Sequence, residues 1–156
     1  SNILRSNMLM GKQRLIHFSE ELKLVHDYLA IEGYRYEERL NVSFDISPKT
    51  KHIMIPPLMI QTLVENGIKH GIAHLPKGGS LAIVAELEKD YLIISITNSG
   101  QYDANKKTET GFGIENTKER LRLLFSGKAS FEIKNKNKTE VICIVKLPQN
   151  IDGNEN

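Results

Sequence analysis

The spacing of hydrophobic residues in the first third of the chain predicts a long helix followed by a strand. Between residues 18 and 39, apolar side chains recur at the spacing of an amphipathic helix, and Ser19 followed by two glutamates has the composition of a helix N-terminus. From residue 40 to residue 46 apolar and polar residues alternate, as they do in a half-buried strand. A second apolar stripe predicts that the helix packs on two sides, and it consists of Leu24, Tyr28 and Ile31.

A second helix is predicted after Pro56-Pro57, because proline suits the first turn of a helix. At 100° per residue its positions divide into two faces. The apolar face comprises Ile60, Leu63, Val64, Gly67, Ile68 and Gly71. The opposite face comprises Thr62, Asn66, Lys69, His70 and Ala73.

The remaining pattern predicts two hairpins separated by a loop and a helix. The strands of the first hairpin cover residues 81–87 and 91–97, and those of the second cover 129–134 and 139–147. Residues 100–110 are polar and predict a lid-like loop, after which residues 114–125 are helical in pattern. Strands joined in hairpins, with helices on one face, predict an α+β two-layer sandwich with a mixed, mostly antiparallel sheet and not a doubly wound one.

Composition narrows the class of protein without naming a function. The 156 residues fit one domain, or one domain with an appendage, and a net charge of +2 argues against a broad nucleic-acid-binding surface. The sequence contains no apolar run long enough to span a membrane and no signal peptide. Cys143 is the only cysteine, which excludes an internal disulfide and a cysteine-based metal site, and fits a reducing compartment.

Three polar residues in the second predicted helix suggest a phosphate-binding site. Asn66, Lys69 and His70 lie within about one turn on one face. An amide oxygen, an ammonium and an imidazole together suit a hydrated Mg²⁺ that carries phosphates, because magnesium prefers oxygen ligands and retains water. The alternative is an ordinary solvated face of an amphipathic helix.

Two glycine-containing segments add to this picture. Gly111-Phe112-Gly113 is expected to form a turn at a helix N-terminus, where backbone N–H groups and the helix dipole favour an anion. Taken alone, such a segment is more often an ordinary loop–helix junction. Asn98-Ser99-Gly100 ends a predicted strand and is by itself only a turn.

Together and in this order, the three segments resemble the N, G1 and G2 boxes of the GHKL ATP-binding fold. In particular they resemble LytS/YehU-type sensor histidine kinases, whose patterns are P-P-x-x-x-Q-x-L-V-E-N-x-x-K-H-G and G-x-G-[LI]-x-N-x-x-x-R-L. Both patterns are nearly unbroken here, and the segment from Phe18 to Arg39 is similar to the helix that precedes the catalytic domain in this family. The resemblance implies a Bergerat-type fold, ATP and Mg²⁺ as cofactors, and transfer of the γ-phosphate to a histidine.

The resemblance also implies roles for individual residues. Asn66 would ligate Mg²⁺, Lys69 and His70 would lie near the phosphates, and Asn98 occupies the position of an adenine-binding aspartate. Gly100 would let the base approach the backbone. The segment that would close over the phosphates comprises Gly111, Phe112, Gly113 and Ile114. The remaining positions that match the family are Asn116 and Arg120 on the following helix and Thr139, which would hold adenine through water. Glu65 either orients a water or a histidine or is a surface glutamate.

Two departures from the family pattern matter. Asn98 replaces the usual aspartate, so its amide oxygen can accept from adenine while its NH₂ needs another partner. Thr62 stands where ATP-hydrolysing relatives have a glutamate base, and threonine has no useful basicity near neutral pH. Hydrolysis by that route is therefore disfavoured relative to transfer to a partner.

The resemblance divides the chain into three parts. Residues 1–17 would end an upstream dimerisation or linker segment, residues 18–148 would form the ATP-binding catalytic domain, and residues 149–156 a polar tail. The phosphoacceptor motif is absent, and His17 lacks its flanking residues. We therefore expect an acceptor helix outside this chain, a homodimeric parent that is a membrane sensor, a response regulator as partner, no nucleic acid, and a cytoplasmic location for this domain. The alternatives are an anti-sigma-type GHKL serine kinase and a degenerate nucleotide-binding interaction module.

Overall fold

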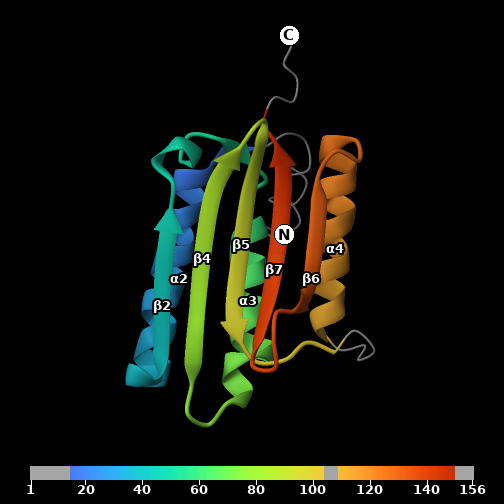
Figure 1. Ribbon diagram of the computed structural model, residues 1–156. Coiled ribbons are helices and arrows are strands. Elements are labelled where there is room, and N and C mark those ends of the chain that lie inside the picture. The colour runs from blue at the N-terminus through green and yellow to red at the C-terminus, as the bar shows by residue number, and fades with distance from the viewer. Residues whose placement is uncertain (1–14, 104–108, 150–156) are drawn as a thin grey trace, which may run out of the picture.

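A five-stranded sheet forms one layer of the protein, and the long helices cover one of its faces (Figure 1). The computed structural model describes residues 15–103 and 109–149, and the side chains of residues 109–112 are outside that description. The strand order is β2-β4-β5-β7-β6. The strands are β2 (Leu40–Ile46), β4 (Gly79–Glu88), β5 (Tyr91–Ser99), β6 (Ser130–Asn135) and β7 (Glu140–Pro148). The predicted two-layer α+β sandwich is confirmed.

The sheet is mixed, as the sequence predicted. β2 pairs with β4 in parallel, whereas the β4–β5, β5–β7 and β6–β7 pairs are antiparallel. Both predicted hairpins form, and the first turns over Lys89 and Asp90, with Lys89 at a φ of 56°. A separate two-stranded sheet pairs β1 (Ile16–His17) with β3 (Met54–Ile55). The sequence pattern did not predict it.

Within the described residues, three α-helices build the second layer: α2 (Phe18–Tyr36), α3 (Met59–His70) and α4 (Glu109–Phe125). The described residues also form short 3₁₀ helices, which are η1 (Glu37–Arg39), η2 (Pro48–Thr50) and η3 (Ile72–His74). The predicted apolar face of α3 is buried throughout, and α3 lies between α2 and α4 in the helical layer (Figure 1). No helix among the described residues is long and apolar enough to cross a membrane.

The core fills the space between the sheet and the helices. Every second residue of β5 points into it, which buries Leu92, Ile94 and Ile96 almost completely. The same alternation continues to Asn98, which therefore occupies a core-facing position with a polar side chain, 7% exposed. A polar residue at an inward position of a central strand needs hydrogen-bond partners, and this places β5's end among the candidates for a functional site.

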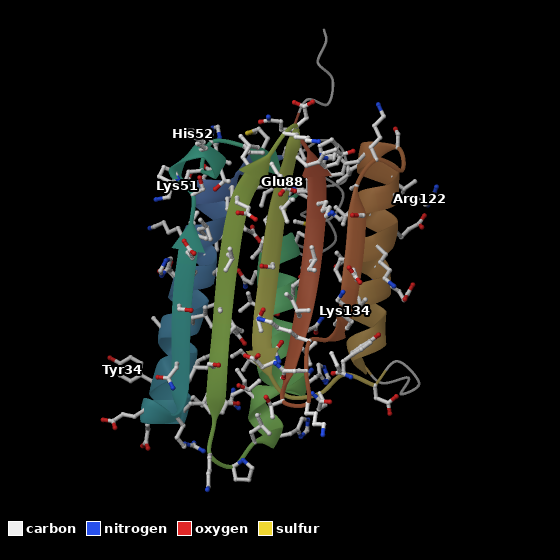
Figure 2. All side chains as sticks on the ribbon, viewed as in Figure 1. Tyr34, Lys51, His52, Glu88, Arg122 and Lys134 are labelled. Carbon is white, nitrogen blue, oxygen red and sulfur yellow. The ribbon has the colours of Figure 1, made fainter. Side chains whose placement is uncertain are left out.

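Two details of α2 correct the sequence prediction. The N-cap is His17, not Ser19, and the backbone N–H of His17 donates to Glu20 Oε1 at 3.1 Å. The predicted second apolar stripe is buried only at Tyr28, which packs partly against the core, whereas Leu24 is 42% and Ile31 67% exposed. Tyr34, which is 88% exposed, projects from the same helix into solvent (Figure 2).

The start of α4 also differs from the prediction. The helix begins at Glu109, so Gly111, Phe112 and Gly113 are part of its backbone and do not form a separate turn. Within the helix, the buried Thr117 donates through Oγ1 to the Gly113 carbonyl at 3.0 Å, one turn back.

Candidate functional site

A pocket lies between the sheet and helices α3 and α4, at the end of β5. It brings together residues from all three predicted segments and from the second hairpin. The lining residues are Leu63, Asn66, Gly67, His70, Gly71, Ile96, Asn98, Gln101, Tyr102, Ile114, Ile133, Val141 and Cys143. Apolar walls with a few inward polar groups are typical of a site for a small organic ligand.

Asn98 is held in one orientation by its own backbone neighbourhood. Its Nδ2 donates to the Ser99 carbonyl at 2.8 Å, which supplies the partner that the amide needs. Its Oδ1 faces Gly67, where an added Cβ would lie 2.9 Å from that oxygen. A Cβ on Gly71 would clash with Asn98 Nδ2. The two glycines therefore make room for the Asn98 amide, a requirement that the sequence pattern did not reveal.

Gly100 closes the same corner of the pocket. Its φ is 133°, its N–H donates to the Thr139 carbonyl at 2.9 Å, and an added Cβ would lie 3.0 Å from Gly71 Cα. Close approach of the two backbones thus requires glycine at this position. The Thr139 side chain does not line the pocket, since its Oγ1 donates to Asn137 Oδ1 at 3.1 Å and the residue is exposed.

Asn66 faces α4 across the pocket. An added Cβ on Gly113 would lie 3.4 Å from Asn66 Nδ2. That nitrogen is buried and has no hydrogen-bond partner among the described residues. A buried amide without a partner costs about 1–3 kcal/mol, so its presence in a pocket points to a polar ligand.

The donor set fits a magnesium ion that is bound chiefly through phosphates. Within the described part of the chain, no group of three or more histidine, cysteine or acidic side chains could hold a metal ion. Mg²⁺ commonly retains water and takes only one or two protein ligands besides substrate phosphates. The Asn66 amide oxygen would suffice as that ligand.

Glu65 and Lys69 lie on another side of α3 from the pocket. Both line a second cavity of about 370 Å³ between α2 and α3, together with Tyr28, Glu32 and Arg35. Gln61 Nε2 donates to Glu65 Oε2 at 3.0 Å. Burial, followed by the charges of Glu32 and Glu65, raises the pKa of Tyr28 to about 12, so this hydroxyl stays protonated. Of the polar residues predicted on α3, Asn66 and His70 are brought into the pocket.

The other predicted residues fall into two groups. Ile114 is buried and lines the pocket, whereas Asn116 is exposed on α4 and does not. Gly111 and Phe112 lie in the first turns of α4, and their side-chain placement is outside the described residues, as is that of lid residues 104–108.

The sequence reasoning missed most of the lining residues, among them Gln101, Tyr102 and Cys143. Gln101 and Tyr102 follow β5, and Tyr102 exchanges two hydrogen bonds with the Asn135 side chain, at 2.7 and 2.9 Å. Cys143 lies on β7 at the pocket floor, where burial raises the pKa of its thiol to about 12. An aromatic residue just after the predicted G1 segment, in an otherwise polar loop, was the available signal for Tyr102.

Comparison with curated proteins finds LytS sensor proteins. The chain is 32% identical to Sensor protein LytS of Staphylococcus haemolyticus over 142 residues, which is 83% of the chain and 24% of that protein. It is 30% identical to the sensor histidine kinase/phosphatase LytS of Staphylococcus aureus strain MRSA252 over 145 residues, 85% of the chain and 25% of that protein. The chain thus spans about a quarter of the length of these relatives. No family model matches it.

Solved structures of histidine kinases share the fold. The catalytic domain of histidine kinase ThkA matches with a TM-score of 0.67 at 14% identity, covering 86% of this chain and 96% of that one. Histidine kinase AdeS of Acinetobacter baumannii matches with a TM-score of 0.63 at 19% identity, covering 94% of this chain and 75% of that one. The fold is therefore that of histidine kinase catalytic domains, consistent with the GHKL class.

Proposed function

The chain belongs to the LytS-type sensor histidine kinases, and we propose that it is their catalytic domain and binds Mg-ATP in the pocket between Asn66 and Asn98. In this proposal it phosphorylates a histidine outside this chain. The observation that carries the proposal is the buried, unpartnered amide nitrogen of Asn66, a residue that lines the same pocket as Asn98. The three predicted segments thus converge on one cavity that has a polar group for each end of a nucleotide.

At the base end of the pocket, Asn98 would recognise adenine. Its Nδ2 is engaged by Ser99, so its Oδ1 is the atom left to accept from the exocyclic amino group. The apolar walls formed by Ile96, Ile114 and Val141 suit the faces of a purine. Adenine would therefore be selected over guanine, which presents a carbonyl oxygen to Asn98 Oδ1.

At the phosphate end, Asn66 and His70 would bind the magnesium-bound triphosphate. Asn66 would offer its amide oxygen to the metal, and His70 would lie near the phosphates. Lys69 and Glu65 line the cavity on the other side of α3, so a role for either in transfer requires the acceptor segment to approach from that side. Bound Mg²⁺ would neutralise the negative charge that builds up on the transferred phosphoryl group.

The reaction proposed is transfer to a nitrogen and not hydrolysis. A bond forms between a histidine nitrogen and the γ-phosphorus while the bond from that phosphorus to the bridging oxygen breaks, and ADP leaves. Thr62 Oγ1 donates to the Leu58 carbonyl at 2.7 Å, so the hydroxyl at the position of the hydrolytic base is engaged with its own helix. Among the described residues lining the pocket, no carboxylate is present to activate a water.

The rest of the signalling unit belongs to the same proposal. We assign residues 18–148 to the catalytic domain, residues 1–17 to the end of an upstream segment and residues 149–156 to a tail. The acceptor helix, a homodimeric membrane-bound parent, a cytoplasmic position for this domain and a response regulator complete it. One solved structure of similar fold is histidine kinase ThkA in complex with response regulator protein TrrA. The curated relatives are sensor kinases, which favours this function over a serine kinase.

A longer form of the protein that includes the acceptor segment tests the reaction. Incubation with γ-labelled ATP and Mg²⁺ should give an acid-labile, alkali-stable phosphate on histidine, and Asn66→Ala should abolish it. Acid-stable phosphate on serine would instead support the serine-kinase alternative. Label released only as inorganic phosphate would refute transfer.

A further inference from the structure

A buried carboxylate on α2 holds the start of the helix that carries Asn66. Glu21 is fully buried, and both of its oxygens accept hydrogen bonds from backbone N–H groups at the N-terminus of α3. Leu58 N–H donates to Oε1 at 2.8 Å, and Gln61 N–H donates to Oε2 at 3.0 Å. The two contacts join residues 37 and 40 positions apart in the sequence.

The N-terminus of α3 provides no cap of its own. Its N-cap residue is Leu58, whose side chain has no hydrogen-bonding group and makes no cap. Leu58 also has a φ of 66°, in the left-handed region that side chains with a Cβ rarely adopt. The orphan N–H groups of the first turn and the strained residue are therefore both held by a side chain from another helix.

The charge of Arg120, on α4, also acts on Glu21. The Nη2 of Arg120 is buried without a hydrogen-bond partner among the described residues. Burial raises the pKa of Glu21, while the N–H groups of Gln61, Leu58 and Ile60 and the charge of Arg120 act in the opposite direction. Burial likewise lowers the pKa of Arg120, and the Glu21 charge opposes it. Each ion thus offsets part of the other's desolvation.

From this geometry we infer that Glu21 is a positioning residue: it fixes the start of α3 relative to α2, and so sets where Asn66 on α3 lies with respect to Gly113 on α4. The inference rests on the proposed nucleotide site. It extends that site to α2, which connects the pocket to whatever lies upstream in the protein. A shift of α2 along its axis would move the Leu58 and Gln61 amides, and with them the first turn of α3.

The test compares Glu21→Gln with the neighbouring Glu20→Gln. An amide keeps the size of the side chain, but its NH₂ cannot accept, so one of the two N–H groups loses its acceptor. Glu20 is exposed and retains an accepting oxygen for His17 as glutamine, so this variant is the matched control. We expect E21Q to weaken Mg-ADP binding by about tenfold, since small misplacements of ligand-binding groups have effects of this size or larger. E20Q should bind as the wild type does.

Stability and positioning are separated by Leu58→Gly. Glycine adopts a positive φ without steric strain, so L58G stabilises the turn without restoring the carboxylate. If E21Q alone does not fold, the pair L58G and L58G/E21Q replaces the wild type and E21Q. Wild-type affinity in a folded E21Q or L58G/E21Q variant would overturn the inference, because Glu21 would then act on folding alone.

A second measurement needs no nucleotide. The ¹H–¹⁵N resonance of the Asn66 side-chain amide should move in E21Q and stay unchanged in E20Q. Failure of the wild type to bind Mg-ADP would refute the proposed function while this resonance still reports on positioning. An unmoved Asn66 resonance in E21Q would overturn the positioning role even if nucleotide binds.

Discussion

Gly67 and Gly33 are both helical glycines, and we predict that alanine has opposite effects at the two positions. Alanine normally stabilises a helix interior by about 1 kcal/mol relative to glycine. A Cβ at Gly33, on α2, would meet no atom within 4 Å, so Gly33→Ala should realise that gain. A Cβ at Gly67, on α3, would lie 2.9 Å from Asn98 Oδ1 and 3.2 Å from its Cγ. The Asn98 amide must then move.

The cost at Gly67 follows from what the amide loses. Displacing Asn98 breaks the 2.8 Å bond from its Nδ2 to the Ser99 carbonyl, which is worth about 1 kcal/mol. Overpacking a buried site typically adds about 1–3 kcal/mol. Against the helical gain of about 1 kcal/mol, Gly67→Ala should lower the free energy of unfolding by about 1–3 kcal/mol. Mg-ADP affinity should fall by about tenfold, equivalent to one hydrogen bond to the base.

Urea unfolding followed by circular dichroism measures the first quantity, and calorimetric titration the second. In the Asn98→Ala background the nearest Asn98 atom left is its Cβ at 3.5 Å, an ordinary contact, so Gly67→Ala should there stabilise the protein. The double-mutant cycle should therefore show a coupling of about 2–4 kcal/mol. If Gly67→Ala stabilises the wild type as Gly33→Ala does, the close packing of Asn98 on α3 is wrong.

Three further variants or conditions test the pocket. Asn66→Ala removes a buried amide nitrogen that has no partner among the described residues. We therefore expect the free energy of unfolding to stay within about 0.5 kcal/mol of the wild-type value or to rise, while Mg-dependent binding of ADP is lost. A large loss of stability would show that the amide is already satisfied. Asn98→Asp would place a carboxylate oxygen against the Ser99 carbonyl at about the present 2.8 Å. Although aspartate is usual in the family, we predict a destabilisation of about 1–2 kcal/mol, measured by urea unfolding, and no gain in affinity for Mg-ADP. Tighter Mg-ADP binding by this variant would contradict the donor role of Asn98 Nδ2. Burial raises the pKa of the Cys143 thiol to about 12, above that of an exposed thiol. The contribution of this group to stability is therefore complete below the pKa of the unfolded chain and is lost as pH rises toward 12. Iodoacetamide should label the native chain at pH 8 far more slowly than the urea-unfolded chain, and equal rates would refute the burial.

Much of the fold could be predicted from the sequence because its elements have strong local patterns. The strand at residues 40–46 alternates cleanly and has the predicted bounds, and the apolar face of α3 is buried as predicted. The parallel pairing of β2 with β4 depends on long-range register and could not be read from either strand alone. The exposed stripe of α2 misled for a related reason, since an apolar pattern does not reveal whether a second layer exists to cover it.

The site was predictable as three segments but not as one geometry. Asn66 and Asn98 converge, yet Glu65 and Lys69, which are close to Asn66 in sequence, line a separate cavity because α3 turns about 100° per residue. The roles of Gly67 and Gly71 depend on atoms of Asn98 that are about thirty residues away along the chain. Glu21 gave no signal of its own, because a glutamate in the first turn of a helix normally serves that helix and not another.

The central claim is that one nucleotide occupies the pocket between Asn66 and Asn98, and side-chain amide resonances test it most directly. In ¹⁵N-labelled protein titrated with ADP, the Asn98 amide should shift in a saturable way, the Asn66 amide should shift only when Mg²⁺ is present, and Asn98→Ala should abolish both responses. Unmoved amides at millimolar Mg-ADP, or shifts confined to residues of the cavity lined by Glu65 and Lys69, would contradict it.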